Sequence, residues 1–234
     1  MKLLHQIKHF LFPDLCALCG GVLFASDEIR QNLCKTCLGE IESEQDAKCE
    51  VCGKPLISEI NICLPCRSNT ERSYERLWTL FPYTGKYRKL LTAYKFSKKL
   101  GIADFLAQKA LEIIEQQPLL KDAVIVPVPP RPGKIKENGW DQVEQLVKRM
   151  EKLSGYKINR CLKRRKSKVQ KELTRMERIE NLKGRIYLNL NKPAPKTVLI
   201  IDDVITTGST IEACAAILKE NGAEKVYAFC LFYD

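Results

Sequence analysis

Four CxxC pairs in the first third of the chain constrain its fold more than any other feature of the sequence. The pairs are Cys16/Cys19, Cys34/Cys37, Cys49/Cys52 and Cys63/Cys66. The stretches "CALCGGVL" and "CEVCGKPL" share the pattern CxxCGxxL and begin 33 residues apart, and each is followed by a second CxxC pair without the glycine. This part of the chain therefore consists of two copies of one small unit.

The spacing of these cysteines predicts metal binding. Two thiolates separated by two residues hold one tetrahedral ion from a single tight turn, and two such turns complete a four-thiolate site. We expect two structural zinc ions, with an iron–sulfur cluster as the alternative. Because every ligand would be a protein thiolate, no bound water is left to activate. The repeat favours sequential pairing of the CxxC pairs, and a cross-braced pairing is the other possibility.

The opening segment and the cysteine content bear on the cellular compartment. The stretch "MKLLHQIKHFLFP" has its apolar residues at helical spacing, which predicts a short amphipathic N-terminal helix rather than a signal peptide. No apolar run approaches the roughly 20 residues of a membrane-spanning helix. Eleven cysteines without a secretion signal indicate metal or thiol chemistry rather than disulfides. These features predict a cytoplasmic protein without membrane insertion. The unpaired Cys161, Cys214 and Cys230 are interpreted as small buried hydrophobic residues.

The net charge of +11 is unevenly distributed along the chain. Residues 1–70 contain 7 basic and 9 acidic side chains, or −2, which leaves 32 basic and 19 acidic side chains, or +13, for residues 71–234. A surplus of this size indicates partners that carry phosphate, either nucleotide-like small molecules or nucleic acid.

Hydrophobic patterning after the cysteines predicts an α/β domain. We expect strands at residues 77–83, 124–129, 185–190, 197–202 and 225–233. Two helices should follow the first strand, a third should cover residues 141–153, and a fourth should run from about residue 210 to residue 221. This alternation is typical of a mostly parallel sheet with helices on both faces. Polar residues 68–76 are expected to form a linker. It would separate a double zinc ribbon with its N-terminal helix, residues 1–70, from the α/β domain, residues 71–234.

The stretch "IIDDVITTGST" combines an acid pair with a hydroxyl-rich loop at a strand-to-helix junction. Backbone N–H groups and hydroxyls of this loop can hold a phosphate monoester at the helix amino terminus, although no P-loop pattern is present. Carboxylates would instead face ligand hydroxyls or a magnesium ion, so the stretch suits a sugar phosphate. A Walker-B-like strand end and a simple helix N-cap are the alternatives. The acid pair is Asp202 and Asp203, and the loop comprises Thr206, Thr207, Gly208, Ser209 and Thr210.

"VLIIDDVITTGST" resembles the phosphoribosyl pyrophosphate (PRPP) motif of type I phosphoribosyltransferases. The resemblance implies that Asp202 and Asp203 are the catalytic pair, which holds the ribose hydroxyls and works with magnesium. It also implies that residues 206–210 bind the ribose 5-phosphate. The fold implied for the α/β domain is that of a type I phosphoribosyltransferase.

Further segments resemble the ComF family, which is phosphoribosyltransferase-like and is associated with DNA uptake in natural competence. They are the paired CxxC units, "IVPVPPRPGKIKENGWDQVEQL" and "VQKELTRMERIENLKG". The resemblance implies that residues 129–136 border the pyrophosphate. It also matches residues 160–185, with 11 basic and 3 acidic side chains, to a loop that closes over the site. Arg175 and Arg178 are the anion-contact candidates of that loop. The family usually has RGFNQ where this chain has "NGWDQ", so Asn138 and Asp141 replace an arginine and an asparagine.

Two functional hypotheses follow. The first is magnesium-dependent PRPP binding, with transfer of phosphoribose to an acceptor that the sequence does not indicate. The alternative is a single-stranded DNA-binding protein that retains a PRPP site for sensing or as inheritance. The segment "YTGKYRKLLTAYKFSKKLG" interleaves aromatic and basic residues, as single-strand binders do. Its helical spacing, however, puts Tyr87, Leu90, Leu91 and Tyr94 on one face, which predicts core packing for the tyrosines. The sequence indicates no oligomeric state.

Overall fold

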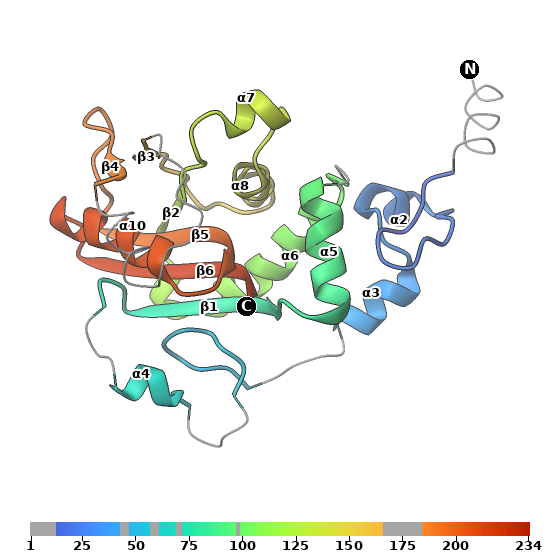
Figure 1. Ribbon diagram of the computed structural model, residues 1–234, viewed down its shortest axis with the longest axis horizontal. Helices are drawn as coiled ribbons and strands as arrows, with labels where there is room; N and C mark the ends of the chain where they lie inside the picture. The colour runs from blue at the N-terminus through green and yellow to red at the C-terminus, as the bar shows by residue number, and fades with distance from the viewer. Residues whose placement is uncertain (1–12, 43–46, 57–60, 69–71, 97–98, 166–183) are drawn as a thin grey trace, which may run out of the picture. The chain divides into compact units, whose positions relative to one another are not determined.

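The computed structural model describes residues 13–42, 47–56, 61–68, 72–96, 99–165 and 184–234 (Figure 1). The chain divides into two compact units, and neither is continuous in sequence. The first comprises Met1–Asp46 and Thr84–Leu106, and the second comprises Ala47–Tyr83 and Ala107–Asp234. The first cysteine repeat therefore lies in one unit and the second repeat in the other. The sequence-based domain limit near residue 70 follows the cysteine repeats rather than these units, and it stays a prediction.

A four-stranded parallel sheet forms the centre of the second unit. Its strands lie in the order β1-β6-β5-β2, and all three neighbouring pairs are parallel. Four of the five segments predicted as strands form this sheet. The strands are β1 (Arg76–Pro82), β2 (Val124–Pro127), β5 (Thr197–Ile205) and β6 (Lys225–Tyr233).

The fifth predicted strand forms a separate small sheet. It is β4 (Ile186–Leu188), which pairs antiparallel with β3 (Leu162–Arg164). The sequence did not predict β3. Three residues of mixed polarity are too few to show the period of two that identifies a strand.

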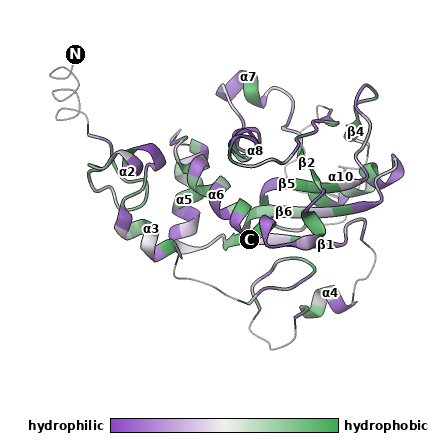
Figure 2. Cartoon of the chain, turned by 180° about the vertical axis from the view of Figure 1, so that it is seen from behind, coloured by the Kyte–Doolittle hydropathy of each residue, from purple (hydrophilic) through white to green (hydrophobic). Residues whose placement is uncertain are grey.

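Helices flank both faces of the parallel sheet. The apolar side of α10 (Ser209–Glu220) packs on one face, where Val198 and Ile200 of β5 belong to the same buried cluster. Leu199 and Ile201 alternate with them, are equally buried and point to the other face, where α8 (Gln142–Leu153) contacts β5 and β2. The strands are largely hydrophobic, as Figure 2 shows, because both of their faces are covered. The predicted face of α10 is confirmed, since its members are buried: Ile211, Cys214, Ala215 and Leu218.

Short helices complete the second unit. They are α4 (Leu64–Ser68), the 3-10 turn η1 (Pro118–Leu120) and α7 (Lys134–Asn138). The longer α6 (Ile102–Glu115) begins in the first unit and ends in the second. Cys161, Cys214 and Cys230 are fully buried in the second unit, as predicted from their lack of partner spacing.

The first unit is mainly helical. It contains α2 (Ser26–Gln31), α3 (Lys35–Glu42), α5 (Gly85–Phe96) and the start of α6. Asn32 ends α2 in the left-handed conformation with φ of 57°, and its side-chain oxygen accepts a 3.1 Å hydrogen bond from the Gly101 N–H. The predicted apolar face of α5 is confirmed, because Tyr87, Leu90, Leu91 and Tyr94 are all buried. The two tyrosines are therefore core residues and not stacking platforms.

Among the described residues, no helix combines the length and the apolar character that crossing a bilayer requires. The amphipathic helix predicted for the start of the chain falls on residues 1–12, which lie outside the described residues.

Candidate functional site

The acid pair lies inside strand β5. Asp202 and Asp203 are both half-buried, and the Asp203 N–H donates a 2.8 Å hydrogen bond to Asp202 Oδ1. The sequence suggested that the strand ends at Asp202, but β5 continues to Ile205. The reason is tertiary, because Val204 and Ile205 still pair with β6. The hydroxyl loop therefore begins after Ile205, and the carboxylates occupy the last half of the strand.

The surroundings of the acid pair keep nearby thiols neutral. Asp202 lies in register with Cys230 of β6. Burial, followed by the negative charges of Asp202 and Asp203, raises the pKa of the Cys230 thiol well above its usual range. Burial and the charge of Asp202 likewise raise the pKa of Cys214 on α10. Two carboxylates without a competing thiolate are hard oxygen donors, the type that magnesium prefers, so the donor set fits this ion.

The hydroxyl loop joins β5 to α10 and has the geometry of a helix amino terminus. Gly208 is the N-cap residue with φ of 77°, and its carbonyl oxygen accepts a 2.9 Å hydrogen bond from the Glu212 N–H. A Cβ at this position would meet only Ile205 Cδ1, at 3.7 Å, so the glycine is required by backbone conformation and not by space. The hydroxyls of Thr207 and Ser209 lie 2.7 Å apart.

The predicted loop residues are thus gathered at the start of α10. Thr206 is exposed, Ser209 is the first residue of the helix, and Thr210 lies in its first turn. Unpaired backbone N–H groups and the helix dipole favour an anion at such a position. The carboxylates and the loop therefore offer two chemically different ends to one ligand.

A pocket of 320 Å³ opens beside this loop. It is lined by residues 205–208 and Tyr233, and also by residues of the second cysteine repeat and of the segment that follows it. All lining residues belong to the second unit. The residues of the repeat and of the segment after it are Cys52, Lys54, Cys63, Cys66, Arg72 and Tyr74.

A larger pocket of 450 Å³ lies at the start of β2, around Val124 and Tyr156. None of its described lining residues is among those that the sequence predicted for a site. We therefore place the candidate site at the pocket beside the hydroxyl loop.

The segment after β2, predicted to border the pyrophosphate, is held by ion pairs. Arg131 and Glu137 approach to 3.1 Å between Nη1 and Oε1, and the hydrogen bond to this carboxylate raises the pKa of Arg131. Lys134 Nζ lies 2.5 Å from Asp141 Oδ2 and also donates to the side-chain oxygen of Gln142. Both cations are therefore already engaged by groups of this chain.

The structure explains one of the two replacements at "NGWDQ", that of an asparagine by Asp141. Asp141 is buried and is the N-cap of α8, where its Oδ1 accepts a 3.0 Å hydrogen bond from the Glu144 N–H. An asparagine could fill the same cap, but only the carboxylate adds the ion pair with Lys134. Asn138 is the last residue of α7.

The predicted anion contacts Arg175 and Arg178 lie outside the described residues. The described ends of the basic segment show two contacts. Arg160 forms a 2.8 Å salt bridge with Glu144 of α8, and the guanidinium of Arg165 lies 5.0 Å from the ring centre of Tyr187.

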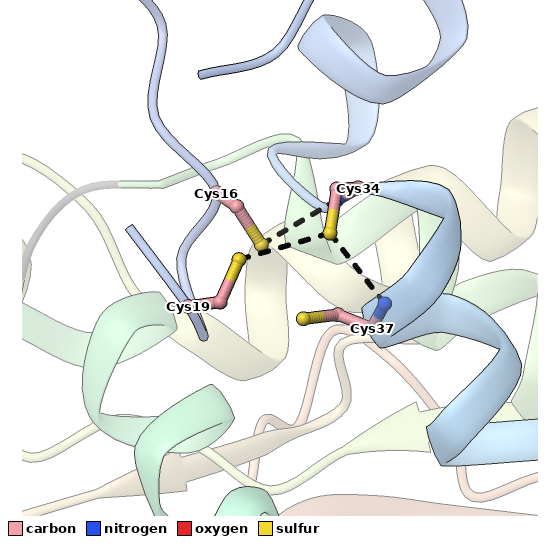
Figure 3. A group of neighbouring side chains, drawn as sticks. All are labelled: Cys16, Cys19, Cys34 and Cys37. Atoms are coloured by element: carbon pink, nitrogen blue, oxygen red, sulfur yellow. Dashed lines mark hydrogen bonds between the residues drawn. The ribbon is translucent and has the colours of Figure 1, made fainter. Parts of the chain in front are cut away.

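The first cysteine cluster lies in the first unit. Cys16 and Cys19 come from one loop, Cys34 and Cys37 from the start of α3, and their sulfur atoms point toward one another (Figure 3). All four sulfurs lie within 4.8 Å of one another, and those of Cys19 and Cys34 are 3.8 Å apart. The backbone N–H of Cys34 donates to Cys16 Sγ at 3.4 Å.

The second cluster repeats this geometry in the second unit. The sulfurs of Cys49, Cys52, Cys63 and Cys66 lie within 4.8 Å of one another, with 3.7 Å between Cys52 and Cys63. Ligands at about 2.3 Å from a tetrahedral zinc ion lie about 3.8 Å apart, so both clusters fit zinc. The pairing is sequential, and the cross-braced alternative is not found.

Hydrogen bonds from backbone N–H groups favour the thiolate form at one cysteine of each cluster, Cys16 and Cys49, whereas burial raises the pKa of Cys37 and Cys52. Burial works against ionisation of Cys16 and Cys49, but backbone N–H donors overcome it and lower the pKa of each to about 7. In Cys49 the donors include the N–H of Cys63, at 3.3 Å from the sulfur.

Residues 72–75 are not the linker that the sequence suggested. The Ser73 N–H and hydroxyl donate to Glu212 Oε1 of α10 at 3.1 and 2.6 Å. Tyr74 is buried in the cluster beneath α10. The polar composition of this stretch gave no signal for these contacts or for Arg72 as a pocket residue, and the cysteine pattern gave none for Lys54 in the second repeat.

Comparison with protein families agrees with this architecture. The model described as "Phosphoribosyl transferase domain" matches residues 138–234, and the model described as "Double zinc ribbon domain" matches residues 7–69. The parallel sheet, its flanking helices and the strand-to-helix loop have the type I phosphoribosyltransferase-like fold.

Similar proteins align with nearly the whole chain. Competence protein ComFC of Streptococcus pneumoniae is 28% identical over 229 residues, which cover 92% of this chain and 98% of that protein. DNA utilization protein YhgH of Salmonella typhimurium is 28% identical over 227 residues, covering 94% and 96%. Competence protein F of Haemophilus influenzae is 27% identical over 228 residues, covering 94% and 97%. The chain is therefore a homologue of the ComFC and YhgH proteins over most of its length, and it combines a phosphoribosyltransferase domain with a double zinc ribbon domain.

Proposed function

We propose that the protein binds PRPP together with magnesium and transfers phosphoribose to an acceptor that is still to be identified. One observation carries the proposal: a single strand-to-helix connection presents two half-buried carboxylates and, immediately after them, a glycine-capped hydroxyl loop. The carboxylates can accept hydrogen bonds from ribose hydroxyls, and the loop can bind a phosphate. The match of residues 138–234 to the phosphoribosyl transferase domain supports the same ligand.

In this proposal the chain positions the ligand and supplies no nucleophile. Asp202 and Asp203 accept hydrogen bonds from the ribose hydroxyls, and residues 206–210 hold the 5-phosphate. A bond forms between the acceptor and ribose C1 while the bond from C1 to pyrophosphate breaks, so the protein's contribution is orientation and charge placement. Magnesium, held by the carboxylates and the ligand, would neutralise charge on the pyrophosphate. Arg175 and Arg178 are proposed as further anion contacts.

Calorimetry with PRPP and magnesium tests the assignment. We expect binding to the native protein and at least tenfold weaker binding to the Asp202→Asn, Asp203→Asn double variant, because the amides lose the charge that attracts magnesium. Asp122→Asn is the matched control, since Asp122 is an exposed carboxylate that lines the 450 Å³ pocket at the start of β2. Absence of PRPP binding, or equal binding by the double variant, contradicts the proposal. A screen for PRPP-dependent pyrophosphate release with bases and amines then identifies the acceptor.

Single-stranded DNA binding is the second candidate function. The names of the relatives, which refer to competence and to DNA utilization, support DNA binding at least as well as they support PRPP binding. The net charge of +11 supports DNA binding too. Tyr187, which is 38% exposed beside Arg165, offers an aromatic ring and a cation at one place. DNA affinity should then fall steeply with salt, and Tyr187→Ala should weaken it. Salt-independent binding, or none, excludes this function.

We also propose the cellular and modular setting. Eight metal-ligating thiols suit a reducing compartment, which supports a cytoplasmic location. The cysteine repeats and the family matches support a double zinc ribbon in residues 1–70 followed by a phosphoribosyltransferase-like domain in residues 71–234.

A further inference from the structure

We propose that Lys54 and Arg72, contributed by the second cysteine repeat and the residues after it, bind the phosphate of the ligand together with residues 206–208. The inference rests on the proposed function for the identity of the ligand as a sugar phosphate. It assigns to this part of the chain a role in ligand binding in addition to holding a metal.

The pocket beside the hydroxyl loop brings these residues together. Lys54 and Arg72 line it together with Thr206, Thr207 and Gly208. Its volume of 320 Å³ lies at the lower end of the roughly 300–1,000 Å³ typical of small-molecule sites. Two cations thus share a cavity with the amide and hydroxyl groups that suit a phosphate, although they lie about 130 residues or more from that loop in sequence.

The chain directly before Lys54 is hydrogen-bonded to strand β1. The carbonyl of Gly53 accepts a 2.5 Å hydrogen bond from the Thr79 hydroxyl, and the carbonyl of Val51 accepts one of 3.0 Å from the Leu77 N–H. Lys48 donates to the carbonyls of Thr79 and Leu80, both at 2.7 Å. Lys54 therefore extends from a turn that the sheet holds in place.

Arg72 is positioned by its neighbours in the same way. Ser73 hydrogen-bonds Glu212 on α10, the helix whose amino terminus carries the hydroxyl loop. Tyr74 is buried in the cluster beneath that helix. The guanidinium is therefore carried by backbone that is tied to the loop-bearing helix.

The negative charge of the second cysteine cluster explains why Lys54 and Arg72 would be needed in this pocket. Three cysteines of the second cluster also line the pocket, and four thiolates around one zinc ion carry a net charge of −2. Such a wall would repel a phosphate dianion unless positive charge compensates. Within the described residues, the side chains of Lys54 and Arg72 form no hydrogen bond or salt bridge with another residue, whereas Arg131 and Lys134 are engaged by carboxylates.

Calorimetry with ribose 5-phosphate, and with ribose as the uncharged comparison, tests the inference without magnesium. We expect the native protein to bind ribose 5-phosphate more tightly than ribose, and the Lys54→Gln, Arg72→Gln double variant to lose at least tenfold of that affinity. Arg67→Gln is the matched control, because Arg67 is an exposed cation of α4 that does not line the pocket. It should change the affinity less than twofold.

Two results overturn the inference: native binding of ribose 5-phosphate no tighter than that of ribose, or unchanged binding by the double variant. The charge-preserving variant Lys54→Arg, Arg72→Lys separates binding from folding. It should retain most of the affinity and the full zinc content, and loss equal to that of the glutamine variant contradicts a charge role.

The outcome is distinguishable from failure of the proposed function. If magnesium-dependent PRPP binding requires Asp202 and Asp203 but the affinity for ribose 5-phosphate does not depend on Lys54 and Arg72, only this inference fails. If PRPP binding is absent but ribose 5-phosphate binding depends on the two cations, the pocket assignment stands and the transferase proposal fails.

Discussion

The hydroxyl of Thr79 on β1 donates a 2.5 Å hydrogen bond to the carbonyl oxygen of Gly53 in the second cysteine repeat. β1 is an edge strand of the parallel sheet, and Lys48, directly before the same repeat, donates to two of its carbonyl groups. The repeat therefore covers backbone groups that an edge strand would otherwise leave open. Gly20, the equivalent glycine of the first repeat, has no comparable neighbour, since a Cβ there would meet nothing within 4 Å.

This difference predicts unequal effects of the same substitution. Both glycines have positive φ, 75° for Gly20 and 68° for Gly53, so alanine adds backbone strain of about 1–2 kcal/mol at either position. At Gly53 the new Cβ would also lie 2.7 Å from Thr79 Cγ2 and 3.0 Å from the Thr79 backbone nitrogen. We expect Gly53→Ala to destabilise the protein by about 1–3 kcal/mol more than Gly20→Ala. Denaturant unfolding measures both, and equal losses would show that the contact with β1 has no energetic weight.

The two metal clusters should differ in their importance for ligand binding. Cys52→Ser and Cys19→Ser should each remove one zinc ion per chain, because each leaves a cluster with three thiolates. Only the second cluster lines the pocket, so only Cys52→Ser should weaken ribose 5-phosphate binding, by at least tenfold. Metal analysis and calorimetry on the same preparations check this. If Cys19→Ser and Cys52→Ser lose the same affinity for ribose 5-phosphate, the ligand does not bind in the pocket that the second cluster lines.

Gly208 should matter for ligand binding beyond its effect on stability. Alanine there is strained by about 1–2 kcal/mol because φ is 77°, and relief of the strain would turn the loop amides away. Gly222→Ala is the control, since this glycine follows the other end of α10 with φ of 97° and has open space around it. We expect similar losses of melting temperature in both variants and a loss of PRPP affinity of about tenfold, or about 1.4 kcal/mol, in Gly208→Ala alone. An unaltered affinity in Gly208→Ala would argue against the loop as the phosphate site.

Asp141 offers a test of the departure at "NGWDQ". Asp141→Asn keeps a good N-cap and loses the ion pair with Lys134, whereas Asp141→Ala loses both. We expect Asp141→Ala to be less stable than Asp141→Asn by about 1 kcal/mol. Asp141→Asn also releases Lys134, so pyrophosphate should bind more tightly to it than to the native protein. Thermal unfolding and pyrophosphate titration measure the two effects, and weaker pyrophosphate binding by the asparagine variant would contradict the expectation that residues 129–136 border the pyrophosphate.

Long elements with regular patterns were predicted well from the sequence. β5, β6, α8 and α10 have nine to twelve residues each, and their apolar positions repeat often enough to show a period. The short β3 and α7 were missed, because three to five residues carry little pattern and their form depends on tertiary contacts. Residues 72–75 were predicted as a linker for the same reason, since nothing in their polar composition indicates the hydrogen bonds between Ser73 and Glu212.

By itself, the sequence determined the chemistry that is local along the chain. Two residues between cysteines place both thiolates on one turn, and the continuous run from Asp202 to Thr210 places carboxylates and loop side by side whatever the rest of the fold. Tertiary structure decided between the sequential pairing of CxxC turns, which the repeat favours, and the cross-braced alternative, and it decided which unit holds the second cluster. It also decided that Lys54 and Arg72 line the same pocket as the loop before α10. The physical reason is that these contacts join distant segments. The pocket shared by Lys54, Arg72 and the loop depends on the pairing of β1 with β6 and of β6 with β5, an order set by packing of the whole sheet and by no local pattern.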